Sequence, residues 1–461
     1  MGLGWLETGT RAPSLGAVKK SSGRDMTLVQ GWGRYPVIDS EVSSPTSDPS
    51  EIAGLVKQAA QPVIARGMGR SYGDSSLSAL MIDCRGLKGF LSFDQETGVV
   101  RCRAGVTLSE LLRNVVPKGW FLPVAPGTKF ITVGGAIASD VHGKNHHVMG
   151  CFSNYVESFD LLLAEGEIVN CSRSERSDLF HATFGGMGLT GIVVEATLSL
   201  QRIRSTYIEQ TTLKAENLAE ALWLLESNRG ATYSVAWIDC LKTGAAMGRS
   251  LLMLGEHAES GGIVYQAKRS VSVPFDMPAL LLNRYSVGVF NALYYHRIRA
   301  KGTIQHQHYE PFFYPLDAIH HWNRLYGKRG VVQYQFVIPK AAGLDGLTAI
   351  FERIVDSRRG SFLAVLKTFG AENANLLSFP LEGYTLAVDF KMDSGLLELL
   401  NELDAMVLDH GGRLYLAKDS RMSENTFKRG YLRWEQFQEV RERYGALGKF
   451  ASDQSRRIGL G

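Results

Sequence analysis

The sequence predicts an α+β protein of two domains, and three features support this prediction. Its 461 residues exceed what one hydrophobic core usually organises, so two domains or one large divided domain are expected. Before Ser205, short strand-like runs alternate with glycine-rich turns. After Ser205, the apolar alternations and the helical patterns become longer. Strands and helices mixed in this way are typical of two α+β units rather than of an all-helical or all-strand protein.

The first unit is predicted to follow an N-terminal extension, residues 1–26, that shows no periodicity and that we expect to be disordered. Apolar spacing and turn residues define its elements. In chain order these are a helix from Pro49 capped by Ser50, a strand at 62–67, three strands and a helix within 80–119, two strands joined by Glu165-Gly166, a short helix at 177–186 and a long strand at 191–203.

The second unit is predicted from residue 204 onward. Its expected elements are a helix at 218–227 and three strands at 331–339, 361–370 and 384–390, with 241–307 as the least regular part. From Gly411 the stretch "GGRLYLAKDS" opens a C-terminal tail rich in Arg, Trp and Tyr.

Composition narrows the function classes. Fifty basic and 46 acidic residues give a net charge of +4, which is too balanced for a nucleic-acid binder that works by charge alone. The five cysteines are scattered and form no CxxC pair, a pattern of buried thiols in a reducing compartment. No apolar run approaches the roughly 18 residues that span a bilayer. We therefore expect a cytoplasmic protein, with contact at the inner membrane surface left open.

Three motifs suggest specific chemistry, and each lacks part of its required context. Residues 186–191 match GxGxxG, but a helix precedes them and a strand follows, the reverse of a dinucleotide-binding turn. Residues 69–73 match GxSxG around Ser71, yet no clear helix follows and no Asp-then-His order completes a hydrolase triad. His142, His146 and His147 have partial zinc spacing, but nearby glycines argue against a shared helix face.

Two glycine-broken stretches, 65–74 and 125–147, remain as the strongest local signal. Each follows a strand and presents several backbone N–H groups, which in tight turns form anion-binding nests. Small residues there would also let a planar ring approach the backbone. The two stretches could hold the ends of a long dianionic cofactor, or they could simply be tight turns.

Several longer motifs resemble the vanillyl-alcohol-oxidase type of FAD flavoproteins. The motifs are "RGMGRSYGD", "PGT", "TVGGAIASDVHGKNHH", "DLFHATFGGMGLTGI", "YQFVIP" and "GGRLYLAKDS". Within that type the chain is similar, from about residue 27 to its end, to the oxidases of polyprenylphosphoryl ribose that serve arabinan synthesis for the cell wall. The resemblance implies a split FAD-binding domain, 27–203 with 413–461 returning to it, around a substrate domain with an antiparallel sheet at 204–412.

The same resemblance implies a set of FAD-binding residues. They are Arg66, Gly67, Met68, Gly69, Arg70, Ser71, Tyr72, Pro126, Gly127, Thr128, Val133, Gly134, Gly135, Ala136, Ser139, Asp140, His142, Gly143, Ile192 and Tyr415. Gly134, Gly135 and Ala136 are expected against the flavin and its diphosphate. Many relatives attach the flavin covalently through a histidine in the first loop. Because Tyr72 stands at about that place, FAD is expected to be bound non-covalently.

The implied reaction is oxidation of a ribose 2'-hydroxyl to a keto sugar, with a separate NADH-dependent reductase as the partner that returns hydride. Lys418, His142 and Tyr72 are the implied catalytic residues, with the Lys418 cation stabilising developing charge. The alternative for Lys418 is a surface salt bridge with Asp419. The implied substrate-binding residues are Lys144, Trp237, Tyr314, Gln333, Gln335, Lys367, Thr385 and Ala387. Thr385 and Ala387 stand where mycobacterial relatives carry asparagine and cysteine, at positions that border the substrate pocket.

Two other functions stay open, and one surface prediction is added. An aldonolactone oxidase of the same superfamily and a serine hydrolase using Ser71 are the alternatives. No metal site is expected. The segment 278–301 could touch a membrane. Its apolar side chains are Leu280, Leu281, Leu282, Val289, Phe290 and Leu293, and its basic ones are Arg284, Arg297, Arg299 and Lys301.

Overall fold

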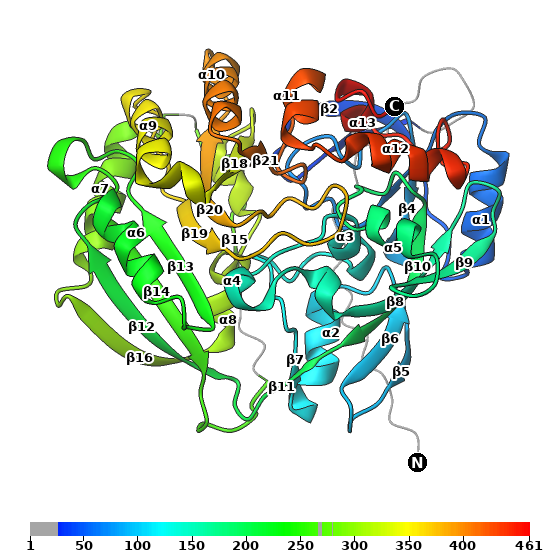
Figure 1. The fold of residues 1–461 in the computed structure, drawn as a ribbon, viewed down its shortest axis with the longest axis horizontal. Helices are drawn as coiled ribbons and strands as arrows, with labels where there is room; N and C mark the ends of the chain where they lie inside the picture. Colours follow the sequence, from blue (N-terminus) through cyan, green and yellow to red (C-terminus); the bar gives the residue numbers. More distant parts are fainter. Residues whose placement is uncertain (1–25, 266–269, 279) are drawn as a thin grey trace.

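The computed structural model describes residues 26–265, 270–278 and 280–461, and its strands form three larger sheets and two small ribbons (Figure 1). The predicted extension therefore lies outside the described residues, apart from Met26, which begins the first strand. A four-stranded sheet has the order β1 (Met26–Gln30), β2 (Val37–Ser43), β4 (Leu80–Asp83) and β3 (Ile64–Arg66). A five-stranded antiparallel sheet has the order β5 (Phe90–Phe93), β6 (Val99–Arg103), β10 (Ile192–Ser199), β8 (Val156–Leu162) and β9 (Ile168–Ser172).

The second half of the chain forms an eight-stranded antiparallel sheet. Its order is β16 (Gly302–His308), β12 (Tyr207–Ala215), β14 (Ser250–His257), β13 (Tyr233–Ile238), β19 (Ala364–Phe369), β20 (Gly383–Lys391), β18 (Val331–Pro339) and β21 (Arg413–Leu414). The two-stranded ribbons are β7 (Trp120–Phe121) with β11 (Gln201–Arg202), and β15 (Val271–Ser272) with β17 (Ile319–His320).

Thirteen α-helices within the described residues surround these sheets. They are α1 (Pro49–Gln58), α2 (Leu108–Val115), α3 (Val133–Ala138), α4 (His146–Met149), α5 (Ser177–Thr183), α6 (Leu218–Ser227), α7 (Arg284–His296), α8 (Tyr309–Phe313), α9 (Gly343–Asp356), α10 (Leu396–Asp409), α11 (Glu424–Gly430), α12 (Trp434–Arg443) and α13 (Asp453–Arg457). Helices α6, α9 and α10 pack against the eight-stranded sheet (Figure 1). Mixed helices and antiparallel sheets confirm the predicted α+β class.

Most of the predicted elements form near their expected places, with three corrections. The N-cap of α1 is Asp48, whose side chain accepts from the Ser50 amide at 2.9 Å, so Ser50 is not the cap. Proline at the first helical position costs no hydrogen bond, so the helix begins at Pro49 and its cap lies two residues before Ser50. The region 241–307, expected to be irregular, contains β14, α7 and β16.

The third correction concerns the second glycine-rich stretch, which was expected to be a loop. Residues 133–138 form helix α3, whose N-cap Thr132 accepts from the Gly135 amide at 3.1 Å. A Cβ at Gly134 would lie 3.1 Å from the Ala104 side chain. The glycine therefore serves close packing of the helix on the neighbouring backbone rather than a turn.

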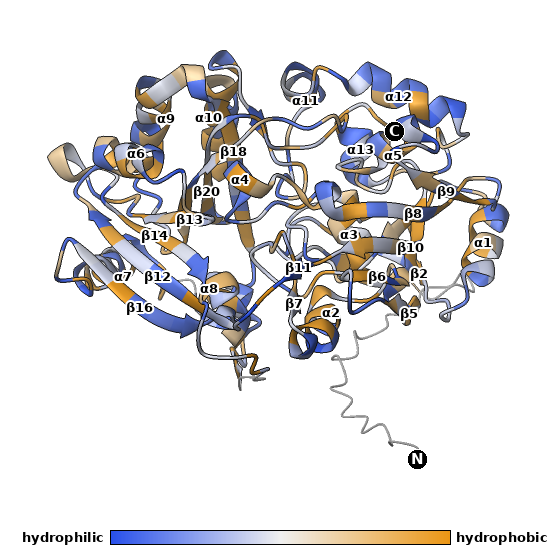
Figure 2. Cartoon of the chain, turned by 60° about the horizontal axis from the view of Figure 1, so that its bottom comes forward, coloured by the Kyte–Doolittle hydropathy of each residue, from blue (hydrophilic) through white to orange (hydrophobic). Residues whose placement is uncertain are grey.

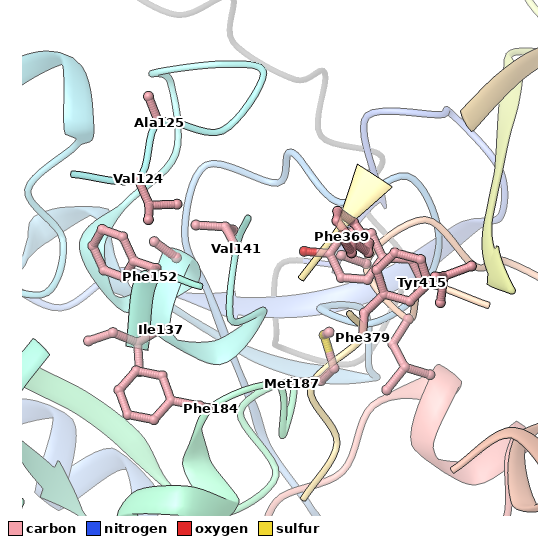
Figure 3. Packing of buried hydrophobic residues seen from close by; sticks show 14 of the residues in the cluster. Val124, Ala125, Ile137, Val141, Phe152, Phe184, Met187, Phe369, Phe379 and Tyr415 are labelled. Carbon is pink, nitrogen blue, oxygen red and sulfur yellow. The ribbon is translucent and has the colours of Figure 1, made fainter. Parts of the chain in front are cut away.

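One continuous buried cluster runs through both halves of the molecule. Figure 3 shows part of it, with Ile137 and Phe184 around α3 on one side and Phe369, Phe379 and Tyr415 on the other. The Phe379 and Tyr415 rings stack with centroids 4.6 Å apart. Because no break in this core separates the halves, the domain boundaries stay a prediction.

The C-terminal tail contacts both halves in turn. Strand β21 pairs with β18 at the edge of the eight-stranded sheet. Further on, the Val63 amide donates to the Lys449 carbonyl at 2.9 Å and the Ala451 amide donates to the Val63 carbonyl at 3.1 Å. The tail thus begins on the sheet of the second half and ends on the strands of the first.

Candidate functional site

A cavity of about 700 Å³ lies between the glycine-rich segments of the first half and one face of the eight-stranded sheet. This volume is in the range of cofactor and substrate pockets. The sheet contributes alternate residues of each strand, for example Gln333 and Gln335 on β18 and Val365 and Lys367 on β19. Such alternation follows from the two-residue period of a strand, which turns every second side chain to the same face.

The first wall of the cavity is the loop Arg66–Tyr72, all of which lines it. Within the described residues, no hydrogen-bond acceptor is found for the backbone N–H groups of residues 67–71. Gly69 has φ +60°, the left-handed conformation that lets successive amides converge. A row of unused amides in such a turn suits an anion such as a diphosphate. The predicted nest is therefore present in this first loop.

The second glycine-rich stretch is organised differently. The amides of Val133 and Gly134 donate to the carbonyls of Val106 and Ala104 at 2.8 and 2.9 Å, and the Gly135 amide donates to the Thr132 side chain. These N–H groups are satisfied within the protein. Gly134 and Gly135 line the cavity by virtue of their small size, which leaves space for a flat ring, rather than as donors to a diphosphate.

The Pro126–Thr128 segment also lines the cavity and is held in place by the second half. Asp317 accepts from Thr128 Oγ1 at 2.7 Å and from the Lys129 amide at 2.9 Å. Lys129 also pairs with Glu310. Burial raises the pKa of the Asp317 carboxyl. These bonds join the two walls across one side of the cavity.

Lys418 lines the cavity from the C-terminal tail, and its ammonium lies 4.3 Å from the centre of the Tyr72 ring. It forms no salt bridge with Asp419, whose carboxylate pairs with Arg457 at 2.8 Å instead. Burial lowers the pKa of Lys418 to about 8, opposed by the charge of Asp389. The surface salt bridge considered for Lys418 is thus not formed in the structure.

Asp389 is a buried carboxylate that the sequence did not indicate. It accepts from Gln333 Nε2 at 2.5 Å and from the Tyr326 hydroxyl at 3.4 Å, and Gln333 also reaches the Tyr72 hydroxyl at 3.4 Å. Burial raises the pKa of Asp389 to about 7. A lone acidic residue on an otherwise apolar strand, "YTLAVDF", was the available signal. Its partners became visible only through the pairing of β18 with β20.

His142, from the second glycine-rich stretch, lines the cavity and contacts side chains of the eight-stranded sheet. Gln335 Nε2 lies 3.3 Å from its Nε2 atom, and Lys367 Nζ lies 3.3 Å from its Nδ1 atom. Burial, followed by the charge of Lys367, holds the pKa of His142 well below its usual range. The imidazole is therefore neutral at physiological pH, able to orient a ligand or accept a proton but not to serve as a fixed cation.

Lys144 and Lys367 add two further amines to the same cavity. Burial lowers the pKa of each to about 7. Lys144 donates to the Phe312 carbonyl and lies 4.3 Å from the Phe312 ring centre. Neither forms an ion pair with a carboxylate among the residues that the structure describes. Amines without a counter-ion in a closed site favour an anionic ligand, which would restore their ordinary pKa values.

Most residues placed at the site by resemblance do line the cavity. They are Arg66, Gly67, Met68, Gly69, Arg70, Ser71, Tyr72, Pro126, Gly127, Thr128, Gly134, Gly135, Ser139, His142, Gly143, Lys144, Ile192, Trp237, Gln333, Gln335, Lys367, Ala387, Tyr415 and Lys418. The fold thus brings together residues from seven separate stretches of the chain: 66–72, 126–144, 192, 237, 333–335, 367–387 and 415–418.

Five of the proposed site residues lie behind the lining instead: Val133, Ala136, Asp140, Tyr314 and Thr385. Val133 and Ala136 face the core because residues three apart lie on the same side of a helix. Asp140 accepts from the Ser153 amide and from the Ser378 hydroxyl, at 3.1 and 2.6 Å. Thr385 donates to the Phe336 carbonyl at 2.8 Å, beneath Gln335. These residues can influence a ligand only through their neighbours.

Several lining residues were missed by the sequence reasoning, among them Trp32, Thr132, Asp317 and Met253. The Arg70 guanidinium stacks on Trp32 with 3.9 Å to the ring centre. "GWG" around Trp32 contains the only local hint, an aromatic residue between two glycines. The others carry no pattern that distinguishes them from core or turn residues.

The structure also shows the surroundings of the GxSxG, GxGxxG and histidine motifs. No helix directly follows Ser71, and within the described residues its hydroxyl has no histidine partner, so the nucleophile elbow is not formed. The GxGxxG stretch lies between α5 and β10, in the reversed order that the sequence indicated. Among the described residues, no group of three His, Cys, Asp or Glu side chains could hold a metal ion. His146 instead accepts from the Gly370 amide at 3.1 Å.

The donor set suits FAD. Unused amides in the Arg66–Tyr72 loop match a diphosphate, small residues on α3 leave room for the ring system, and Lys418 and Tyr415 lie on the opposite side. Residues 45–172 match a family model described as an FAD binding domain. This segment contains the first loop, the Pro126–Thr128 segment and α3.

Comparison with known proteins extends the match to nearly the whole chain. The decaprenylphosphoryl-beta-D-ribose oxidase of Mycolicibacterium smegmatis is 39% identical over 453 residues, covering 94% of this chain and 97% of that protein. An uncharacterized protein of Streptomyces coelicolor is 32% identical over 375 residues, covering 77% of this chain and 100% of that protein. A D-lactate dehydrogenase of Anaerostipes hadrus is 30% identical over 187 residues, 38% of each chain. With its FAD-binding domain and a match that runs the length of both chains, this protein is an FAD-dependent oxidoreductase and belongs to the decaprenylphosphoryl-beta-D-ribose oxidase family.

Proposed function

We propose that this chain oxidises the 2'-hydroxyl of a polyprenylphosphoryl-beta-D-ribose to a 2'-keto sugar. The observation that supports this substrate most directly is the trio of cavity lysines, of which Lys144 and Lys367 have no carboxylate partner in the described part of the chain. A phosphodiester supplies the negative charge that these amines lack. The printed name of the Mycolicibacterium smegmatis relative points to the same substrate class.

The residues around the cavity divide the work of this reaction. FAD, when bound, accepts the two electrons removed from the alcohol. The protonated Lys418 stabilises the negative charge that develops as the hydroxyl is oxidised, and the low-dielectric surroundings strengthen that effect. Neutral His142, held between Gln335 and Lys367, positions the sugar and can accept the hydroxyl proton.

FAD is proposed to bind without a covalent link. Tyr72 occupies the loop where covalent relatives carry a histidine, and its ring packs among Trp322, Tyr326 and Val331. Burial raises the pKa of its phenol well above the usual value, so it is not a nucleophile at neutral pH. Acid precipitation should release all flavin to the supernatant. Flavin that remains in the pellet with the protein would contradict this assignment.

The keto sugar is proposed to pass to a separate NADH-dependent reductase, which returns hydride to the other face and so completes an inversion at the 2' carbon. The purified protein alone should then accumulate the keto product. Adding sodium borodeuteride should trap it with deuterium at the 2' carbon, as mass spectrometry would show. Absence of a reducible product during flavin reduction would refute a 2'-oxidation.

The substrate would be met at a membrane, through a surface that we call the α7 face: Leu280, Leu281, Val289, Phe290 and Leu293 with Arg284, Arg299 and Lys301. Val289 and Leu293 are 62% and 70% exposed and stand four residues apart, which puts them on one side of the helix. The basic residues have no acidic partner among the described residues. In the described segments, no helix has the length and apolar character to cross a bilayer. Two residues of the predicted segment are not part of this surface: Leu282 is half-buried against the cluster that contains Tyr72 and Trp322, and Arg297 stacks on Tyr294 and lines the cavity.

One assay tests the main proposal. Anaerobic flavin reduction is measured by absorbance with polyprenylphosphoryl ribose, with the same lipid phosphate lacking the sugar, and with aldonolactones. Reduction by the ribose compound alone is expected. Reduction by lactones with no response to the ribose compound would replace the proposal by the lactone oxidase alternative.

The α7 face has its own test. The protein should pellet with vesicles that contain anionic lipid at low salt and be released at high salt, because each basic residue contributes about 1 kcal/mol near such a surface. Changing Arg284, Arg299 and Lys301 together to Gln should abolish pelleting. Equal pelleting of both forms, or none by either, would leave the α7 face without a membrane role.

A further inference from the structure

The cavity continues well beyond the residues that the proposed reaction uses. From Lys367 on β19 its floor passes Trp237 on β13, Met253 on β14 and Gln210 on β12, and ends at Gln305 on the edge strand β16. Four strand spacings separate β19 from β16, or about 19 Å at the usual distance between strands. A phosphate attached to a sugar cannot extend that far. The outer part of the cavity therefore has room for another portion of the ligand.

Three polar side chains along this outer part, Gln210, Gln307 and Trp237, have hydrogen-bond partners within the protein. Gln307 Nε2 donates to Gln210 Oε1 at 2.5 Å, and Gln210 Nε2 donates to Thr212 at 2.8 Å. Trp237 Nε1 donates to the Phe362 carbonyl at 3.1 Å. The main cost of covering polar groups is a donor left without a partner. An apolar chain lying over these donors would avoid that cost, because each keeps its partner within the protein. Figure 2 shows hydrophobic and hydrophilic residues mixed along β12 and β16.

Aromatic side chains flank the same passage. Tyr294 of α7 packs on Trp237 with ring centroids 4.8 Å apart, and Phe312 of α8 lines the cavity from the other side. Arg297, just after α7, stacks on Tyr294 at 3.8 Å and donates to its hydroxyl at 3.0 Å. The outer side of α7 carries the exposed Leu293. The passage thus runs under the helix that presents the α7 face.

We propose that this outer arm, defined by Gln210, Val235, Trp237, Met253, Tyr294 and Gln305, binds the first isoprene units of the substrate's prenyl chain. The chain leaves the arm beside Arg297, at the level of the lipid headgroups, and the remainder stays in the bilayer. This inference rests on the proposed function. It adds to that function a preference for long prenyl chains that does not depend on a membrane.

Chain-length preference in detergent tests the arm. Ribose carried on a geranyl phosphate and on a decaprenyl phosphate is supplied in neutral detergent micelles, so that vesicle binding plays no part. The longer chain should have a kcat/KM at least about tenfold higher, expressed mainly in KM, because several apolar groups are buried. Met253→Glu, which puts a charge along the chain, should remove most of that advantage. Trp237→Ala, which opens the wall, should do the same.

Ile304→Ser provides the matched control, since Ile304 lies beside Gln305 on β16 but is 81% exposed and outside the lining. It should keep the chain-length ratio of the parent protein. Equal kcat/KM for the two chain lengths in the parent protein would overturn the arm while leaving the proposed reaction intact. An unchanged ratio in both arm variants, with thermal melts confirming their folding, would also overturn it. Failure of both substrates to reduce flavin would instead refute the proposed function.

Discussion

The two walls of the cavity use different chemistry. The wall from the first half presents main chain and small residues, including the amides of residues 67–71 and the glycines of α3. The wall from the eight-stranded sheet presents long side chains on alternate positions, with Gln333, Gln335 and Lys367 as examples. Backbone amides suit a cofactor that many proteins share, whereas recognition of a particular substrate requires side chains. Changes on the two walls should therefore separate FAD binding from turnover.

The largest expected effect is at Lys418, where the tail places a cation beside the side-chain wall. Lys418→Ala should keep FAD and lose a factor of about 10²–10³ in kcat, the usual result of removing one stabilising charge from a closed site. Stopped-flow flavin reduction measures it. Lys428→Ala, a surface lysine paired with Glu424 one turn away, is the matched control and should remain active. A kcat of Lys418→Ala within about threefold of the parent value would contradict the role of Lys418 in charge stabilisation.

On the backbone wall, Gly67→Ala should act on cofactor retention. The added Cβ would lie 2.4 Å from Thr132 Oγ1, which caps α3. Displacing this cap should cost about 1–2 kcal/mol of unfolding free energy, and flavin content after gel filtration should fall. The residual holoenzyme should turn over normally. Gly54→Ala on α1, where a Cβ meets nothing within 4 Å, should keep its flavin and melt no lower than the parent. Full flavin content in Gly67→Ala would contradict the assignment of FAD binding to the backbone wall.

Asp389→Asn should change the pH dependence of turnover more than its maximum. Burial lowers the pKa of Lys418 to about 8, and the negative charge of Asp389 opposes that shift. Removing the charge should lower the pKa further. Lys418 then loses its proton at a lower pH, so the alkaline limb of the kcat profile should shift to lower pH. Acetic anhydride labelling of Lys418 across pH, read by peptide mass spectrometry, measures the same pKa without turnover.

Asp404→Asn is the control for that experiment. Asp404 is another buried carboxylate, but it pairs with Arg421 and accepts from the Tyr334 hydroxyl at 3.0 Å, behind the wall. Its change should lower thermal stability and leave the alkaline limb in place. Movement of the limb in both variants, or in neither, would mean that Asp389 does not hold the charge of Lys418.

The smallest expected effect is at Thr385, beneath the wall. Thr385→Val removes the hydroxyl that donates to the Phe336 carbonyl and lies 3.4 Å from the Gln335 amide. The loss of one neutral hydrogen bond should cost about 1 kcal/mol of unfolding free energy. Flavin content and kcat should stay close to those of the parent, as steady-state assays would show. A large loss of kcat would place Thr385 in contact with the substrate after all.

Much of this architecture was accessible from local sequence. Glycine-rich loops, strand alternation and caps are short-range properties, so the loop Arg66–Tyr72, the strands β18, β19 and β20 and helix α6 form near their expected places. The cofactor class followed from long motifs in those same segments and is confirmed by the matched FAD binding domain. The lining role of Lys418 followed from the resemblance alone.

Tertiary structure decided the features that depend on how strands pair and on which side chains face the cavity. The register of β18 with β20 sets Gln333 opposite Asp389, and only then does the buried carboxylate belong to the site. That register pairs Thr385 with Val337, and Thr385 lies 3.4 Å from the Gln335 amide and outside the cavity lining. The packing of α3 on Ala104 uses the amides expected to hold a diphosphate. Short-range patterns fix which element forms, because they act through backbone preference and neighbours in the chain. Which side chain meets the ligand depends on contacts between segments hundreds of residues apart, and those exist only once the chain has folded.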